Sequence, residues 1–111
     1  MVKLPNWKNV IILREKLSKY LLSETHPLGM FKAKFFRNLG FNNKNVTLLE
    51  KSLRIIAQSG DVVDMVSSDY GTKYVIDGEI KTPSREVVKL KTVWIIEKGE
   101  KRPRFVTTYP V

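Results

Sequence analysis

The segment NVTLLEKSLRIIAQSGDVVDMVSSDYGTKYVIDGEI, residues 45–80, decides the fold because the spacing of its apolar residues changes at Gly60. Before Gly60, apolar side chains recur every three or four residues, which is the period of a helix with one buried face. After Gly60 they alternate, which is the period of a β-strand. The segment therefore predicts a helix of about twelve residues that is capped by Asn45 and closed near Gly60, followed by a sheet.

Two more helices are expected on the N-terminal side of this segment. Helical spacing predicts one over 13–22 and another over 30–39, with Pro27 interrupting the chain in a loop over 23–29. Phe31 and Phe35 share a stripe of the second helix and are expected to face the core. The basic side chains of that helix then form an exposed fringe, which consists of Lys32, Lys34 and Arg37.

The C-terminal half is expected to contain strands over 61–67, 72–80, 87–97 and 104–109, separated by turns. The connections are too short for parallel crossovers, so the strands are expected to pair as an antiparallel meander. In the last strand, simple alternation puts Phe105, Thr107 and Tyr109 on one side and Arg104 on the other.

The fold expected from this pattern is α+β, with about three N-terminal helices packed on a four-stranded antiparallel β-meander. With 111 residues the chain is expected to form one domain. Within it, residues 1–12 are an N-terminal extension, 13–60 the helical half and 61–111 the antiparallel sheet.

The composition excludes several kinds of site. The chain has no Cys and one His, which rules out disulfide scaffolds, thiolate zinc sites, iron–sulfur clusters, thiol nucleophiles and multi-histidine metal sites. No metal and no cofactor are expected. No apolar stretch approaches the length of a membrane span, and no signal peptide is recognised, so we expect a cytoplasmic protein or a module delivered by a larger one.

The positive charge is concentrated in the first half of the chain. The net charge is +9, and residues 1–60 carry eleven basic residues against three acidic ones, whereas residues 61–111 carry nine against eight. A field of this sign favours polyanions, with RNA as the first expectation and an acidic protein partner as the second. A basic face that serves only solubility is the third reading.

A ribonuclease that works without metal needs a base for the ribose 2′-hydroxyl, cations for the phosphate and an acid for the leaving oxygen. His26 lies in a loop next to a basic helix and has a ring that titrates near neutrality. Lys73 and the last strand offer polar groups to the sheet. Each of these residues also has an ordinary structural explanation, as a turn, edge or strand residue.

Several motifs, in order, resemble those of an uncharacterised small bacterial domain family that occurs alone and as a C-terminal module of toxin-like proteins. The motifs are Lys16-Leu17-Ser18-Lys19-Tyr20-Leu21-Leu22, His26-Pro27 with Gly29, Lys32-Ala33-Lys34-Phe35-Phe36, Gly40-Phe41, Tyr70-Gly71-Thr72-Lys73-Tyr74, Thr92-Val93-Trp94, and Arg104 with Val106-Thr107 and Tyr109-Pro110. In layout the family is similar to the barnase, EndoU, colicin and RelE group of ribonuclease toxins.

The resemblance implies an endoribonuclease-like toxin domain that acts on RNA and has an acidic antitoxin or immunity partner. It implies catalytic roles for His26, Lys73, Arg104, Thr107 and Tyr109 and, together with the basic fringe, phosphate binding by Lys32, Lys34, Arg37 and Thr92. Side chains from both halves of the chain are then expected to converge in a single cationic pocket. The chain lacks the Glu and His pair of a barnase-like site, so a RelE-like scheme is the more compatible one. The alternatives are a non-catalytic module that binds RNA or an acidic protein, and a structural subunit.

Overall fold

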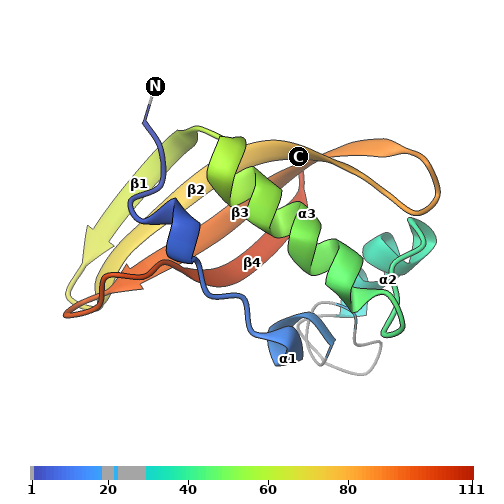
Figure 1. Ribbon diagram of the computed structural model, residues 1–111, viewed down its shortest axis with the longest axis horizontal. Helices are drawn as coiled ribbons and strands as arrows, with labels where there is room; N and C mark the ends of the chain where they lie inside the picture. The colour runs from blue at the N-terminus through green and yellow to red at the C-terminus, as the bar shows by residue number, and fades with distance from the viewer. Residues whose placement is uncertain (1, 19–21, 23–29) are drawn as a thin grey trace.

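The computed structural model describes residues 2–18, 22 and 30–111, and these residues have the expected α+β architecture. The four strands form one antiparallel sheet in the order β1-β2-β3-β4, so the expected meander is confirmed (Figure 1). The described elements are the 3-10 turn η1 (Trp7–Asn9), the helices α1 (Arg14–Lys16), α2 (Met30–Asn38) and α3 (Val46–Ser59), and the strands β1 (Val62–Ser68), β2 (Gly71–Lys81), β3 (Val87–Glu97) and β4 (Arg104–Pro110).

Helix α3 packs across one side of the sheet, which we call the core face (Figure 1). Its buried residues are Leu49, Leu53, Ile56 and Ala57, spaced as the sequence pattern predicts. Ile56 sits against the backbone of β2 because position 78 is glycine; a Cβ atom there would lie 2.7 Å from Ile56 Cγ1. The helix and the strand therefore approach more closely than a side chain at position 78 would allow.

The centre of the core face is built around Trp94 in β3. The Trp94 ring meets Phe105 of β4 edge to face, with the ring centroids 5.4 Å apart. Its Nε1 donates a hydrogen bond to Thr92 Oγ1 at 2.9 Å, and Thr92 Oγ1 donates to the carbonyl oxygen of Ile76 at 2.9 Å. The only polar atom of this indole, Nε1, is thus hydrogen-bonded inside the core, as burial requires.

The first twelve residues, considered an N-terminal extension from sequence, contribute to the core. Leu4, Val10 and Ile12 are buried. Backbone hydrogen bonds join Val62 N–H to Val2 O at the β1 edge and Phe105 N–H to Ile11 O at the β4 edge. The segment therefore spans the width of the sheet and covers part of its outer strand on the β4 side.

The helical half differs from expectation in detail. The helix expected over 13–22 begins one residue later, because Leu13 is extended and α1 starts at Arg14. Residues 19–21 of the expected helix lie outside the described part of the chain. Of the two α2 phenylalanines whose side chains are described, Phe36 is fully buried and Phe35 is half-buried, with the ring centroids 5.1 Å apart in an edge-to-face contact. The side chain of Phe31, which was expected to face the core, lies outside the described residues. The Phe36 ring also packs against the ring of Phe41, which follows the helix.

The Thr92 hydroxyl is expected to stabilise the fold because it accepts the hydrogen bond of the buried Trp94 Nε1. Thr92→Val keeps the shape of the side chain but leaves Trp94 Nε1 buried without an acceptor, which costs about 1–3 kcal/mol of unfolding free energy. Urea unfolding of the variant measures this, with Thr92→Ser as the control that retains the hydroxyl. A Thr92→Val protein as stable as the wild type would show that the hydrogen bond contributes nothing.

Candidate functional site

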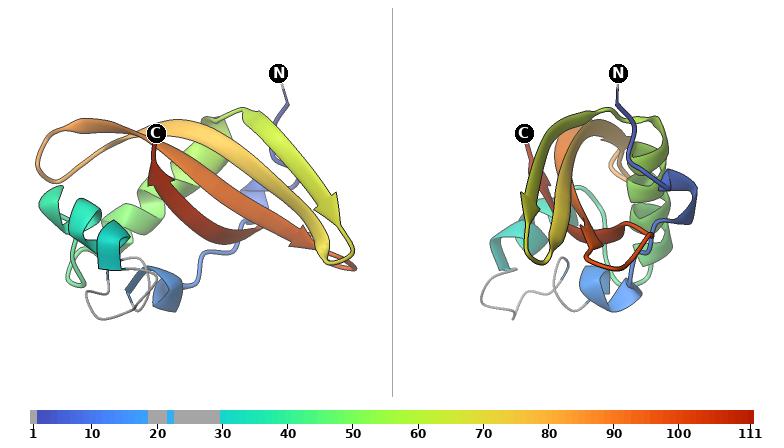
Figure 2. Two further views of the ribbon diagram at one scale, coloured as in Figure 1. Left: turned by 180° about the vertical axis from the view of Figure 1, so that it is seen from behind. Right: turned by 90° about the vertical axis from the view of Figure 1, so that its left-hand side faces the viewer.

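The second side of the sheet, which we call the open face, is turned away from α3. Seen from behind, its central strands lie in front of α3, and none of the described helices covers the middle of the sheet there (Figure 2). Side chains that point to this face come from alternate positions of each strand. In β2 and β3 they include Lys73, Val75, Lys91, Val93 and Ile95, in register with one another.

A β-bulge in β4 decides which of its side chains reach the open face. Thr107 pairs with Val93, but Phe105 pairs with the very next residue, Trp94, so Val106 is an extra residue in β4. The bulge shifts the alternation by one position, which places Arg104 on the open face together with Thr107 and Tyr109. The expectation that Arg104 lies on the opposite side from Thr107 and Tyr109 is therefore wrong, because simple alternation does not hold across a bulge.

The pairing arranges the open-face side chains in rows across the strands. Lys73 pairs with Ile95 and Ile95 with Arg104, so Lys73 and Arg104 flank one isoleucine. Neighbouring strands are about 4.8 Å apart, which puts the Cα atoms of Lys73 and Arg104 about 10 Å from each other. Their long side chains are thus able to reach a common anion lying over Ile95.

A second row joins Asp77, Lys91 and Tyr109. Lys91 Nζ lies 2.9 Å from Asp77 Oδ1 in a salt bridge. The hydrogen bond to Asp77 raises the pKa of the Lys91 ammonium above its ordinary value of 10.5; partial desolvation opposes this, and the charges of Asp77, Tyr109 and Asp64 add to it. Lys91 is therefore a permanent cation beside Tyr109.

The cations of the open face differ in how far they are already paired. Arg104 Nη1 lies 3.3 Å from Glu97 Oε1, so part of its charge is balanced. Lys73 is exposed and forms no ion pair with any residue that the structure describes. An incoming phosphate would therefore meet Lys73 without first displacing a carboxylate.

Lys91 is the open-face residue that the sequence argument did not select. Alternation along the strand puts Lys91 on the same side as Val93 and Ile95, and the sequence shows this much. Its position opposite Tyr109 follows only from the strand register. Choosing between Lys89 and Lys91 needs that register, which the sequence pattern alone does not supply.

Two other predicted site residues, Thr92 and Arg37, have partners away from the open face. Thr92 is fully buried on the core face, where its hydroxyl is engaged by Ile76 and Trp94, so it is not available to a phosphate. Arg37 of α2 donates from Nε and Nη2 to the carbonyl oxygen of Leu22, at 3.0 and 2.7 Å. His26 and the side chain of Lys32 lie outside the described residues.

Helix α2 and its exposed Lys34 lie at the other end of the sheet from Lys73 and Arg104. The backbone N–H of Ser84, in the turn between β2 and β3, donates to Leu39 O just after α2. Lys73 and Arg104 instead lie near the turns that join β1 to β2 and β3 to β4, at the far end in Figure 1. The expected single cationic pocket with side chains from both halves is therefore not present among the described residues.

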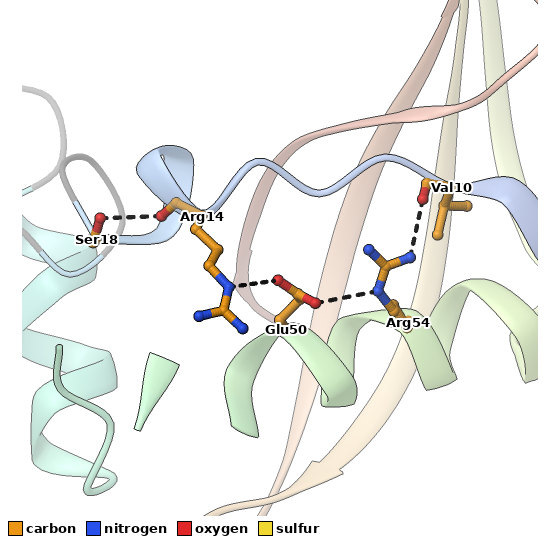
Figure 3. Close-up of polar contacts among 5 residues, drawn as sticks. All are labelled: Val10, Arg14, Ser18, Glu50 and Arg54. Carbon is orange, nitrogen blue, oxygen red and sulfur yellow. Dashed lines mark hydrogen bonds and ion pairs between the residues drawn. The ribbon is translucent and has the colours of Figure 1, made fainter. Parts of the chain in front are cut away.

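A separate charged cluster joins the N-terminal segment to α3 (Figure 3). Glu50 lies between two guanidinium groups, with Arg14 Nε 3.5 Å from Oε1 and Arg54 Nε 3.4 Å from Oε2. Arg54 Nη1 also donates to the carbonyl oxygen of Val10 at 3.0 Å. Each group of this cluster is engaged within the protein, so we interpret it as a clasp that holds residues 10–14 on α3.

The hollows described on the surface lie away from the open face. One, of about 270 Å³, runs between α3 and the end of β2, with Leu48, Ile55 and Pro83 among its lining residues. Among the described residues, no three His, Cys, Asp or Glu side chains gather as a metal site would require. No described helix is long and apolar enough to span a membrane.

Comparisons with known proteins give a family and a fold. The family model "Domain of unknown function (DUF6883)" matches residues 3–111, and the chain belongs to that family. No curated protein matches the sequence. In structure the chain is similar to one in a contact-dependent growth inhibition toxin–immunity protein complex from Klebsiella pneumoniae 342, with a TM-score of 0.72, 18% identity, and 91% of this chain and 99% of that chain covered. The likeness shows a fold shared with a chain of that complex.

Asp77→Asn is expected to lower the pKa of the Lys91 ammonium towards its ordinary value, because the charged hydrogen-bond acceptor is lost. A group whose pKa is raised by folding stabilises the protein below its unfolded pKa, and that contribution is lost as the pH rises through the folded value. NMR titration of the lysine side chains at alkaline pH measures the shift. An unchanged Lys91 titration in the variant would contradict the pairing, and Lys89 serves as the control lysine on the same strand.

Glu50→Ala is expected to destabilise the fold by about 1 kcal/mol, because it leaves two guanidinium groups facing each other; their exposure to water limits the effect. Thermal unfolding measures the change. Lys51→Ala is the control on the same helix, with an expected effect within about 0.5 kcal/mol. Equal effects of the two substitutions on thermal unfolding would contradict a stabilising role for the Glu50 ion pairs.

Proposed function

From the geometry of the open face, we propose that the chain is an endoribonuclease-like toxin domain that cleaves RNA without a metal ion. The proposal rests on one observation. The bulge in β4 brings Arg104, Thr107 and Tyr109 to the same uncovered face as Lys73 and Lys91. The fold is shared with a chain of a toxin–immunity protein complex, which is compatible with a toxin or an immunity-type module. The choice of a toxin rests on the residues of the open face, because a fold alone does not imply a function.

The proposed reaction is attack by a ribose 2′-hydroxyl on the neighbouring phosphorus. The new bond joins O2′ to phosphorus, the bond from phosphorus to O5′ breaks, and the products carry a 2′,3′-cyclic phosphate and a 5′-hydroxyl. A base takes the proton of the 2′-hydroxyl and an acid gives one to O5′. Negative charge grows on the phosphate oxygens in the transition state, so fixed cations at that point lower the barrier.

The open-face residues fit the electrostatic part of this scheme. Lys73 and Arg104 flank the place where the phosphate would lie, and the Thr107 hydroxyl comes from the adjacent row, opposite Val93. Like any ordinary lysine, Lys91 is protonated in the neutral range, and its hydrogen bond to Asp77 raises its pKa further. It is therefore suited to holding charge and unsuited to acting as the base.

Proton transfer is assigned to Tyr109 and His26. Tyr109 lies opposite Lys91 on the open face and is 37% exposed. His26 is proposed on its chemistry alone, since it lies outside the described residues. The basic residues of helix α2, Lys34 among them, are proposed to attract RNA over a longer range rather than to contact the scissile phosphate.

An acidic immunity or antitoxin protein is the proposed partner, in keeping with the net charge of +9 and with the complex that contains the similar chain. We propose that the toxin acts in the cytoplasm, where RNA is found, either alone or after delivery as a module of a larger protein.

A second candidate function is a binding module without catalysis, favoured by the apolar strip on the open face. Val75 and Val93 lie between the two charged rows, and Val66 and Ile95 lie beside Lys73 in the first of them. Val66 is 57% exposed. Apolar area surrounded by charges is typical of protein interfaces. The two functions differ in whether RNA is cut.

The test is incubation of the purified protein with RNA in the presence of EDTA. We expect fragments with 2′,3′-cyclic phosphate ends, and we expect Lys73→Ala and Arg104→Ala each to reduce the rate about 100-fold, because each removes a cation from the developing charge. Lys44→Ala is the matched control, since Lys44 is exposed and lies in the connection between α2 and α3.

RNA that stays intact under these conditions while binding to the protein would support the binding module instead. A loss of activity in EDTA would contradict the metal-independent scheme. Toxicity on induced expression that disappears with Arg104→Ala, but persists with Lys44→Ala, would connect the site to the biological effect.

A further inference from the structure

Tyr70, in the turn between β1 and β2, is the most exposed large apolar side chain of the described residues, at 81%. A single exposed apolar side chain is ordinary on a protein surface, so the exposure of Tyr70 by itself assigns no ligand. The ring becomes informative through two further features, which are the fixed backbone of its turn and the cations around it.

The exposure of Tyr70 does not come from a loosely held turn. Its backbone N–H donates to Ser68 Oγ at 3.2 Å, and its carbonyl oxygen accepts the N–H of Lys98 at 2.9 Å. The next residue, Gly71, has a φ of 143°, and a Cβ atom there would lie 2.3 Å from Ile96 O. The β1–β2 turn is thus bound to the end of β3, which fixes the backbone that carries the ring.

The charges around this end of the sheet suit a nucleic acid. The turns that join β1 to β2 and β3 to β4 lie side by side at this end (Figure 1). These two turns and the adjoining strand ends contain five basic residues and three acidic ones, and the acidic residues are Asp69, Glu97 and Glu100. The basic residues are Lys73, Lys98, Lys101, Arg102 and Arg104.

We propose that Tyr70 stacks on a base of single-stranded RNA whose neighbouring phosphate lies between Lys73 and Arg104. Lys73 follows Tyr70 by three residues of extended chain, about 10 Å, so one short stretch of RNA is able to touch both. An exposed aromatic ring beside cations is the arrangement by which proteins hold single strands, with stacking on the base and charge on the backbone. This inference rests on the proposed function and adds a contact to the base.

The test measures binding of a fluorescent single-stranded RNA whose 2′-hydroxyls are methylated to prevent cleavage. Tyr70→Leu keeps an apolar side chain but removes the ring, and we expect it to weaken binding about 10-fold, as stacking interactions usually do. Tyr70→Phe keeps the ring and is expected to bind within about twofold of the wild type. The salt dependence of binding is expected to stay unchanged in Tyr70→Leu and to become shallower in Lys73→Ala, which removes a phosphate contact.

A second experiment identifies the base on which Tyr70 stacks. It uses RNA strands with an intact backbone in which one base at a time is removed, position by position. At the position where Tyr70 stacks, removing the base is expected to weaken the wild type about 10-fold and to leave Tyr70→Leu unaffected. Equal binding by the wild type and Tyr70→Leu would overturn the inference while leaving RNA binding intact. A wild type that does not bind RNA at low salt would overturn the proposed function as well, and loss of an immunity partner alone in Tyr70→Leu would assign the ring to a protein contact.

Discussion

The extra residue in β4 is the constraint on which the rest of the open face depends. Phe105 must point into the core to pack on Trp94, and Thr108, whose hydroxyl donates to Lys91 O, must do so two positions beyond Val106. Both are on the same side of the strand only because Val106 interrupts the alternation. The same interruption sends Arg104, Thr107 and Tyr109 to the opposite side. Packing of the core and assembly of the candidate site are thus two results of one local irregularity.

The sequence was informative where the apolar period was regular and its length was sufficient. The helix over Val46–Ser59 and all four strands lie within a residue or two of their expected positions, because burial on one side imposes a clear period on each of them. The bulge could not be recognised from the sequence. Whichever side of β4 is assigned to the core, the residues of Arg104–Pro110 suit their positions on both sides. Only the partner residues in β3 decide the parity, and they become known with the register.

The placement of the basic residues changes the expected mechanism. The sequence argument brought the cations of the second helix and of the sheet into one pocket, but α2 lies beside the β2–β3 turn while Lys73 and Arg104 lie near the other turns. Thr92 failed as a site residue for a different reason, because a hydroxyl inside a sheet serves the nearest buried donor, here Trp94. What remains is a shallow surface with a few well-placed cations, which requires the RNA to lie across the strands.

The account is tested most directly by mapping where RNA touches the protein. Backbone amide shifts followed by NMR during titration with a methylated, uncleavable RNA report this residue by residue. The account predicts that the changes concentrate on the open face, at Lys73, Lys91, Arg104 and Thr107, with little change along α3. Changes confined to α3 and the N-terminal segment, with the open face unaffected, would contradict it.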